Sequence, residues 1–88
     1  MSINITVKDR NEQTLINFPN VEMEMTVQEF KKLFLSECET AKKKKLSAPR
    51  LRFTVNAADG TPLSDVTKQL SQYIEEPVVT LYFKDLGP

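Results

Sequence analysis

Apolar and polar residues alternate with a period of two in three stretches of the chain, residues 3–7, 51–55 and 79–83. This alternation is typical of β-strands that bury one face and expose the other. The apolar positions are Ile3, Ile5, Val7, Leu51, Phe53, Val55, Val79, Leu81 and Phe83. The last stretch follows Pro77 and is rich in β-branched and aromatic residues, which predicts a central strand at the end of the domain.

Residues 14–18 continue the extended pattern and are expected to pair back on the first strand as a hairpin. Two inward sets are open, Leu15 with Asn17 or Ile16 with Phe18. The second is favoured, because a slip of one residue would place the Asn17 amide in the core. Pro19 and Asn20 are expected to end this strand.

A helix is predicted from Val27 to about Glu39, or further into the lysines after it. Thr26 and Glu29 have the spacing of a capping box, in which each side chain accepts a hydrogen bond from the other residue's amide. One apolar stripe has helical spacing and consists of Val27, Phe30, Leu33, Phe34 and Cys38. Cys38 is therefore expected to be a buried core thiol.

Asp59-Gly60 indicates a hairpin turn after the third strand, and Pro49 marks the break before it. Residues 61–63 then predict a very short edge strand. Ser64 is expected to cap a short second helix that carries Val66, Leu70 and Ile74 on one face. The resulting order predicts a single two-layer α+β domain over residues 1–88, a mixed four- to five-stranded sheet on one main helix.

Composition excludes several classes of function. The 88 residues carry 12 basic and 12 acidic side chains, so no net charge attracts nucleic acid. The chain is expected to be a monomer. There is no histidine, only one cysteine and only two glycines. The sequence thus offers no His-based triad, no zinc ligand set and no glycine-rich phosphate loop. No catalytic, cofactor-binding or metal residue is expected, and Glu75-Glu76 is interpreted as a solvated loop.

Without a signal segment or an apolar span, the chain is expected to be a soluble cytosolic domain. The single cysteine rules out an internal disulfide, which fits a reducing compartment.

Two groups of residues are candidates for binding. The first is the run Lys42, Lys43, Lys44 and Lys45. Two interpretations are open for it: a solvated loop, or a contact with anionic lipid head groups or with the phosphates of an acyl-CoA.

The second group lies on the outward face of the predicted sheet. Its candidate residues are Lys8, Arg52, Tyr82 and Lys84, with Thr6, Thr54 and Thr80 beside them. Here the face is basic and polar. It is either a docking surface for an acidic partner or a plain solvated face.

The element order and the Thr-capped helix resemble the ubiquitin-like β-grasp. In ubiquitin the face that corresponds to the outward face carries an aliphatic patch that partner domains recognise. The end of the chain, Leu81-Tyr82-Phe83-Lys84-Asp85-Leu86-Gly87-Pro88, is similar to a segment of the very-long-chain trans-2,3-enoyl-CoA reductases. In that family, Phe-(Lys/Arg)-Asp-Leu-Gly-(Ala/Pro)-Gln closes an N-terminal ubiquitin-like domain and leads into the first membrane span. Further matches are Thr26, Glu29, Lys31, Leu33 and Phe34 in the helix and Leu51-Arg52 in the third strand.

This resemblance implies a non-catalytic head of an endoplasmic-reticulum enzyme, on the cytosolic side, that reduces enoyl-CoA with NADPH in fatty-acid elongation. The partners it implies are the enzyme's own membrane domain or other elongation enzymes, with an anionic membrane surface as a further contact. The alternative is a free-standing ubiquitin-like interaction module. The chain departs from the family pattern in ending before the glutamine, in its lysine-rich connection and in an extended turn over residues 54–61. Because Pro88 comes after Gly87, a conjugated modifier is not expected.

Overall fold

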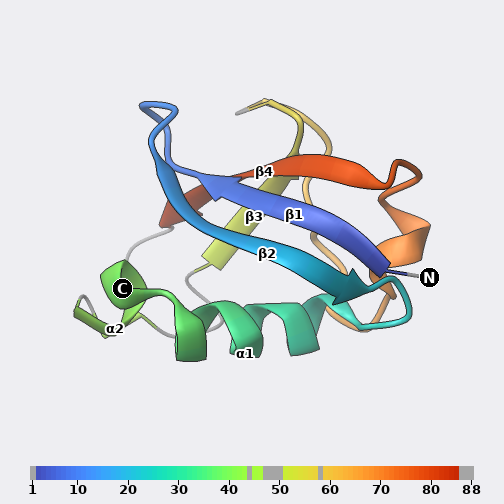
Figure 1. Ribbon diagram of the computed structural model, residues 1–88, viewed down its shortest axis with the longest axis horizontal. Coiled ribbons are helices and arrows are strands. Elements are labelled where there is room, and N and C mark those ends of the chain that lie inside the picture. The colour runs from blue at the N-terminus through green and yellow to red at the C-terminus, as the bar shows by residue number, and fades with distance from the viewer. Residues whose placement is uncertain (1, 44, 47–50, 58, 86–88) are drawn as a thin grey trace.

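The computed structural model describes residues 2–43, 45–46, 51–57 and 59–85. Lys44, Pro49 and Leu86 to Pro88, on which parts of the sequence interpretation rest, lie outside the described residues. A four-stranded mixed sheet in the order β2-β1-β4-β3 lies above a main helix, α1 (Figure 1). The elements are β1 (Ser2–Lys8), β2 (Thr14–Glu22), α1 (Val27–Glu37), α2 (Glu39–Lys43), β3 (Leu51–Val55), the 3-10 helix η2 (Leu70–Gln72) and β4 (Val78–Asp85).

The last strand occupies the middle of the sheet, as the sequence predicts. β4 runs parallel to β1 and antiparallel to β3. The register places Val7 beside Leu81 and Phe53 beside Phe83, so the apolar positions of all three strands fall on one face. Leu81 and Phe53 are fully buried. The period-two pattern of these strands is therefore confirmed.

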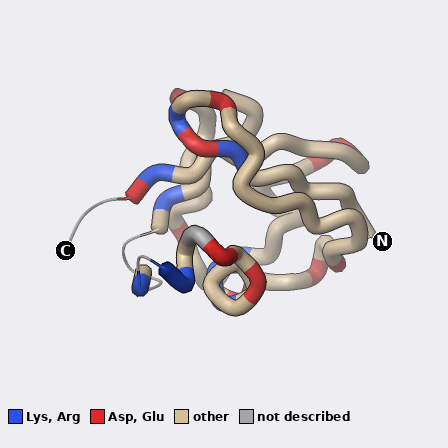
Figure 2. The backbone as a smooth tube through the Cα atoms, turned by 60° about the vertical axis from the view of Figure 1, so that its left-hand side comes forward, with Lys and Arg blue, Asp and Glu red and all other residues tan. Residues whose placement is uncertain are grey.

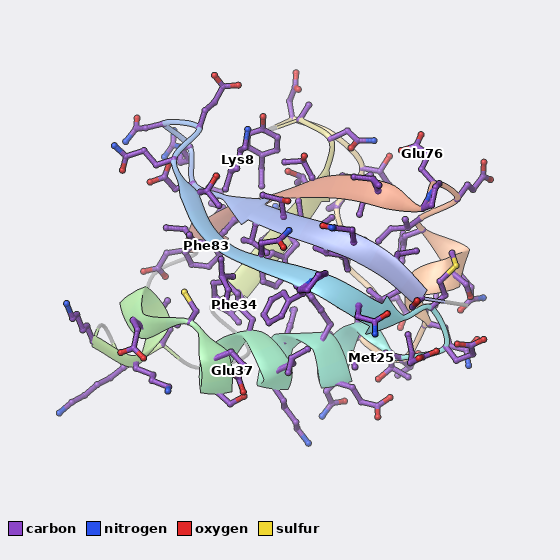
Figure 3. The ribbon with its side chains drawn as sticks, viewed as in Figure 1. Lys8, Met25, Phe34, Glu37, Glu76 and Phe83 are labelled. Atoms are coloured by element: carbon purple, nitrogen blue, oxygen red, sulfur yellow. The ribbon has the colours of Figure 1, made fainter. Side chains whose placement is uncertain are left out.

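All five phenylalanines of the chain form one connected set of ring contacts between the sheet and α1. Phe30 of α1 contacts Phe18 of β2 and Phe53 of β3, with ring centroids 5.5 and 5.3 Å apart. Phe34 contacts Phe53 and Phe83, at 5.2 and 5.4 Å (Figure 3). Most of these pairs are edge-to-face, the geometry that aromatic quadrupoles prefer.

The prediction that Pro19 ends the second strand is wrong. β2 continues to Glu22, because the pairing skips one residue between Phe18 and Val21, which is a β-bulge. β2 is an edge strand, where a proline without an N–H is tolerated. Phe18 points inward as expected.

A second irregularity in β2 changes the expected inward set. Val7 pairs with Ile16 and Lys8 with Thr14, so the register shifts next to Leu15. Both Leu15 and Ile16 are half-buried, where only Ile16 was expected to face the core. Asn17 is exposed, as predicted.

The capping box at the start of α1 is confirmed. Glu29 N–H donates to the Thr26 hydroxyl at 3.2 Å, and Thr26 N–H donates to Glu29 Oε1 at 3.0 Å. The Glu29 carboxylate accepts from the Thr26 N–H and also from the Thr26 hydroxyl, at 3.0 Å, and these two hydrogen bonds hold the pKa of Glu29 below its ordinary value. Two further amides of the first turn donate to carbonyls of a distant segment, Val27 to Lys68 and Gln28 to Val66. The helix start is thus satisfied largely by tertiary contacts.

The helix ends two residues earlier than predicted. Cys38 leaves the helical conformation, with φ −85° and ψ 118°, while its N–H still donates to Phe34 O at 2.9 Å. The chain then turns into α2, and both Cys38 and Ala41 become buried. The prediction of a buried thiol at Cys38, which is 1% exposed, is confirmed.

The predicted second helix is reduced to one 3-10 turn, η2, and Ser64 does not cap it. Residues 66–71 instead run beside the turn before α1, where Leu70 N–H donates to Met25 O at 2.8 Å. Leu70 and Ile74 are buried as expected, and Val66 is half-buried. The short edge strand is present as an isolated bridge between Thr54 and Pro62.

One lysine belongs to the buried face of α1. Lys31 is 7% exposed and lies among Val27, Phe30 and Phe34 on that face. Burial is the main cause that lowers the pKa of Lys31 from its ordinary value, and the charge of Arg52 is the second. Carrying a charge at this position therefore costs folding free energy.

The capping box gives a first testable prediction. Thr26→Ala is expected to lower the free energy of unfolding by about 1 kcal/mol, because one amide of the first turn loses its acceptor. Ser36→Ala on the same helix is the control and should change the free energy by less than about 0.5 kcal/mol. Urea denaturation measures both. Equal losses in the two variants would contradict the capping role.

The buried lysine gives a second prediction. Lys31→Met keeps the unbranched stem and removes the charge, so the melting temperature should rise by up to about 5 °C at neutral pH. Because the pKa of Lys31 is lowered in the folded state, the unfolded chain binds more protons between that pKa and the ordinary value near 10.5. The cost of the Lys31 charge to the free energy of unfolding of the wild type therefore decreases as the pH rises through this window.

The advantage of the Lys31→Met variant should accordingly shrink as the pH approaches 10.5. Comparing the two proteins at each pH cancels the opposing effect of Tyr82, whose raised pKa acts in the same range. A constant difference between pH 7 and pH 10.5 would show that the charge of Lys31 is not the cause.

Candidate interaction surface

The four residues predicted on the outward face of the sheet lie on that face in the structure. Lys8 is the register partner of Tyr82 across the β1–β4 pair. Arg52 is the partner of Lys84 across the β3–β4 pair. Tyr82 and Lys8 are half-buried, whereas Arg52 and Lys84 are exposed. Three neighbouring strands therefore present these side chains together.

Thr54 was expected to be exposed on this face but is buried, with 7% of its surface exposed. The loop after β3 folds back over it, and the Thr54 hydroxyl donates to Ala57 O at 2.6 Å. Gly60 makes this loop possible, since a Cβ at that position would lie 2.2 Å from Val55 O. The extended turn thus forms a wall beside the outward face.

A shallow hollow of about 350 Å³ lies between this wall and the sheet. Its lining combines predicted and unforeseen residues: Arg10, Arg52, Thr54, Asp59, Gly60, Pro62, Tyr82, Phe83 and Lys84. Three of these side chains are cationic and one is anionic. Arg10 and Asp59 come from turns, whose position over the sheet no local sequence pattern indicates. The hollow favours a ligand group with negative charge.

Tyr82 connects the hollow to the β1–β2 turn. Its hydroxyl donates to Glu12 Oε1 at 3.2 Å, across 70 residues of sequence. The pKa of Tyr82 is raised, first by burial and then by the hydrogen bond and the charge of Glu12. Tyr82 is therefore a neutral phenol at physiological pH. Asp9 shapes the same turn by accepting from the amides of Asn11 and Gln13, at 2.8 and 3.0 Å.

The rest of the outward face is polar. The Asn17 amide donates to Asn4 Oδ1 at 2.8 Å and to Thr6 Oγ1 at 2.9 Å, which links β2 to β1. Among the described residues the only large hydrophobic side chain that is strongly exposed is Val78, at 66%. A single exposed apolar residue is ordinary for a protein surface. The described part of this face therefore carries no aliphatic patch.

The lysine run lies at a different place from the hollow, at the end of α2. Lys42 and Lys43 are exposed, and Lys42 pairs with Glu39 across one helical turn, 3.7 Å apart. Lys45 adopts a left-handed conformation, with φ 52°, that closes the C-terminus of α2. Leu46 N–H then donates to Ala41 O at 3.1 Å, which completes a Schellman-type cap. Lys44 lies outside the described residues.

Two kinds of feature are absent from the described residues. No group of three or more His, Cys, Asp or Glu side chains among them is placed to hold a metal ion. Across the same residues, no helix is long and apolar enough to cross a membrane.

Comparison with solved structures identifies the class of fold. The solution structure of the ubiquitin-like domain of an Arabidopsis thaliana protein matches with a TM-score of 0.71 and 18% identity, over 99% of this chain and 80% of that one. A designed protein based on ubiquitin matches with a TM-score of 0.66 and 20% identity, over 96% and 88% of the two chains. No family model and no curated protein sequence matches this chain.

The chain therefore has the ubiquitin-like β-grasp fold. At these levels of identity the likeness establishes the fold alone.

The polar face gives a third prediction. A ubiquitin-associated domain titrated into the labelled protein should leave the amide signals of Tyr82 and Lys84 unshifted, because the apolar contact that such domains need is absent from this face. Ubiquitin, titrated with the same domain, is the positive control. Saturable shifts centred on Tyr82 and Lys84 would refute the prediction.

Proposed function

We propose that this chain is the cytosol-facing, N-terminal ubiquitin-like domain of a very-long-chain trans-2,3-enoyl-CoA reductase of the endoplasmic reticulum. Its role there is to position the enzyme and to contact partners in fatty-acid elongation. The observation that carries the proposal is the segment Leu81 to Pro88, which resembles the family motif that precedes the first membrane span. Reduction with NADPH belongs to the membrane domain of such an enzyme and not to these residues.

The place of that segment in the fold supports a positioning role. β4 is held on both sides, by β1 and by β3, and Phe83 is anchored in the phenylalanine contacts. The described chain is thus fixed as far as Asp85. Three residues span at most about 11 Å when fully extended. A membrane span that begins just after Pro88 would therefore hold the domain close to the bilayer surface.

The hollow around Tyr82 supports a partner contact. Arg10, Arg52 and Lys84 face it, so an acidic surface is the complementary partner. In the proposed enzyme this surface belongs to its own membrane domain or to another elongation enzyme. A free-standing ubiquitin-like interaction module is the second candidate, and the fold itself is the observation that favours it.

The fourth prediction separates these two candidates. The native transcript is expected to continue through the codon for Pro88 into a glutamine and then into long apolar spans. The encoded full-length protein should oxidise NADPH in the presence of a trans-2-enoyl-CoA. A protein lacking residues 1–88 should keep this activity in detergent, because the reacting groups lie elsewhere, but support less elongation in intact membranes. A stop codon directly after Pro88 would rule out the reductase and leave the free-standing module.

A further inference from the structure

The charges of this electrically neutral chain are separated along its length. α2, the start of β3 and the end of β4 lie together at one end of the molecule, whose longest dimension is 32 Å (Figures 1 and 2). These elements carry a set of basic side chains, Lys42, Lys43, Lys45, Arg52 and Lys84, which we call the basic end. In sequence, the stretch from Ala41 to Phe53 contains six basic residues and no acidic one.

The opposite end is acidic. It consists of the turn after β2, η2 and the segment that leads into β4, which hydrogen bonds hold together, including Ser71 N–H to Met23 O at 3.0 Å. Its acidic residues are Glu22, Glu24, Asp65, Glu75 and Glu76, with Lys68 as the cation among them. Glu76 lies at this end in Figure 3, far from α2.

The basic end also contains acidic groups, which reduce its charge without cancelling it. Glu39 pairs with Lys42, Glu37 ends α1, and Asp85 ends β4. The β1–β2 turn lies at the same end in Figure 1 and adds Asp9 and Glu12 together with the cation Arg10. Lys43, Lys45, Arg52 and Lys84 are all exposed.

We infer that the basic end rests on an anionic lipid bilayer, with the acidic end turned away from it. Electrostatic attraction in physiological salt decays over about 8 Å. A bilayer therefore acts on the nearer end of a domain 32 Å long, and the distant acidic end contributes little repulsion. Zero net charge does not prevent binding under these conditions. It makes binding depend on orientation.

The path of the chain agrees with this orientation. β4 runs toward the basic end, so Asp85, the last described residue, lies at that end with these cations. Under the proposed function, the sequence after Asp85 leads into the membrane, and the agreement in orientation rests on that proposal. The charge separation itself does not, since it is a property of residues 1–88 alone.

The inference is tested with the 88-residue protein and lipid vesicles. Vesicles with about 30 mol % phosphatidylserine in phosphatidylcholine should sediment the protein in about 0.15 M salt, and pure phosphatidylcholine vesicles should not. The variant Lys42→Ala/Lys43→Ala/Lys45→Ala should lose this binding, since each lysine removed lowers the partition coefficient by up to about fivefold.

A matched control removes the same charge elsewhere. Lys31→Met/Lys32→Ala/Lys68→Ala has the same net charge as the first variant but leaves the basic end intact. It should bind anionic vesicles nearly as well as the wild type. Equal loss in both variants would mean that only net charge matters and would overturn the inference, as would equal binding to neutral vesicles.

Amide chemical shifts distinguish a bilayer from a discrete anion site. Vesicle binding should broaden signals from α2 and the end of β4 first. If inorganic phosphate alone shifts the same signals saturably, a phosphate site replaces the bilayer contact. All of these readouts are independent of any sequence beyond Pro88. Failure here therefore leaves the reductase proposal standing, and a stop codon after Pro88 would leave a positive vesicle result valid.

Discussion

The contacts among five phenylalanines hold the two layers of this domain together. Each ring of the sheet reaches α1 through Phe30 or Phe34, and Phe53 touches both. Removing a ring from such a buried site typically costs about 3–5 kcal/mol, a large part of the stability of a small domain. The position of α1 relative to the sheet is therefore set by a few side chains rather than by its length or its intrinsic propensity.

The same contacts make the fold dependent on its last strand. Phe83 joins the set only when β4 has entered the sheet between β1 and β3. The pairing of β1 with β4 closes a loop of more than 70 residues, which is an entropic cost that local elements do not offset. The central position of β4 also means that any segment attached beyond Asp85 is connected to the most constrained strand of the domain. This connection supports the proposed positioning role.

Sequence patterns predicted the elements whose causes are local. Period-two alternation is sufficient for β1, β3 and β4, and the capping box fixes the start of α1 because both partners lie within one turn. The errors have tertiary causes. Pro19 is compatible with β2 because an edge strand and a bulge leave its missing N–H without consequence. The helix ends at Glu37, where Cys38 leaves the helical conformation, and both Cys38 and Ala41 of the turn into α2 are buried in the core. Ser64 does not cap a second helix, because residues 66–71 instead run beside the turn before α1 and hydrogen-bond to it.

The same distinction between local and tertiary causes applies to the surface residues. Alternation along three strands correctly placed Lys8, Arg52, Tyr82 and Lys84 on one face, since register and pleat are sufficient for that. It did not place Arg10, Asp59 or the buried Thr54, because the folding of two turns over the sheet decides their positions. Composition was also incomplete as a guide to binding. Equal numbers of basic and acidic residues exclude a strong overall field, but they do not describe how the charges are arranged. Once the fold separates them along 32 Å, a screened environment acts on each end separately. An aliphatic patch would recognise a partner through buried area. This surface has to do so through the arrangement of its charges, so its contacts should depend on salt and orientation more than on contact area.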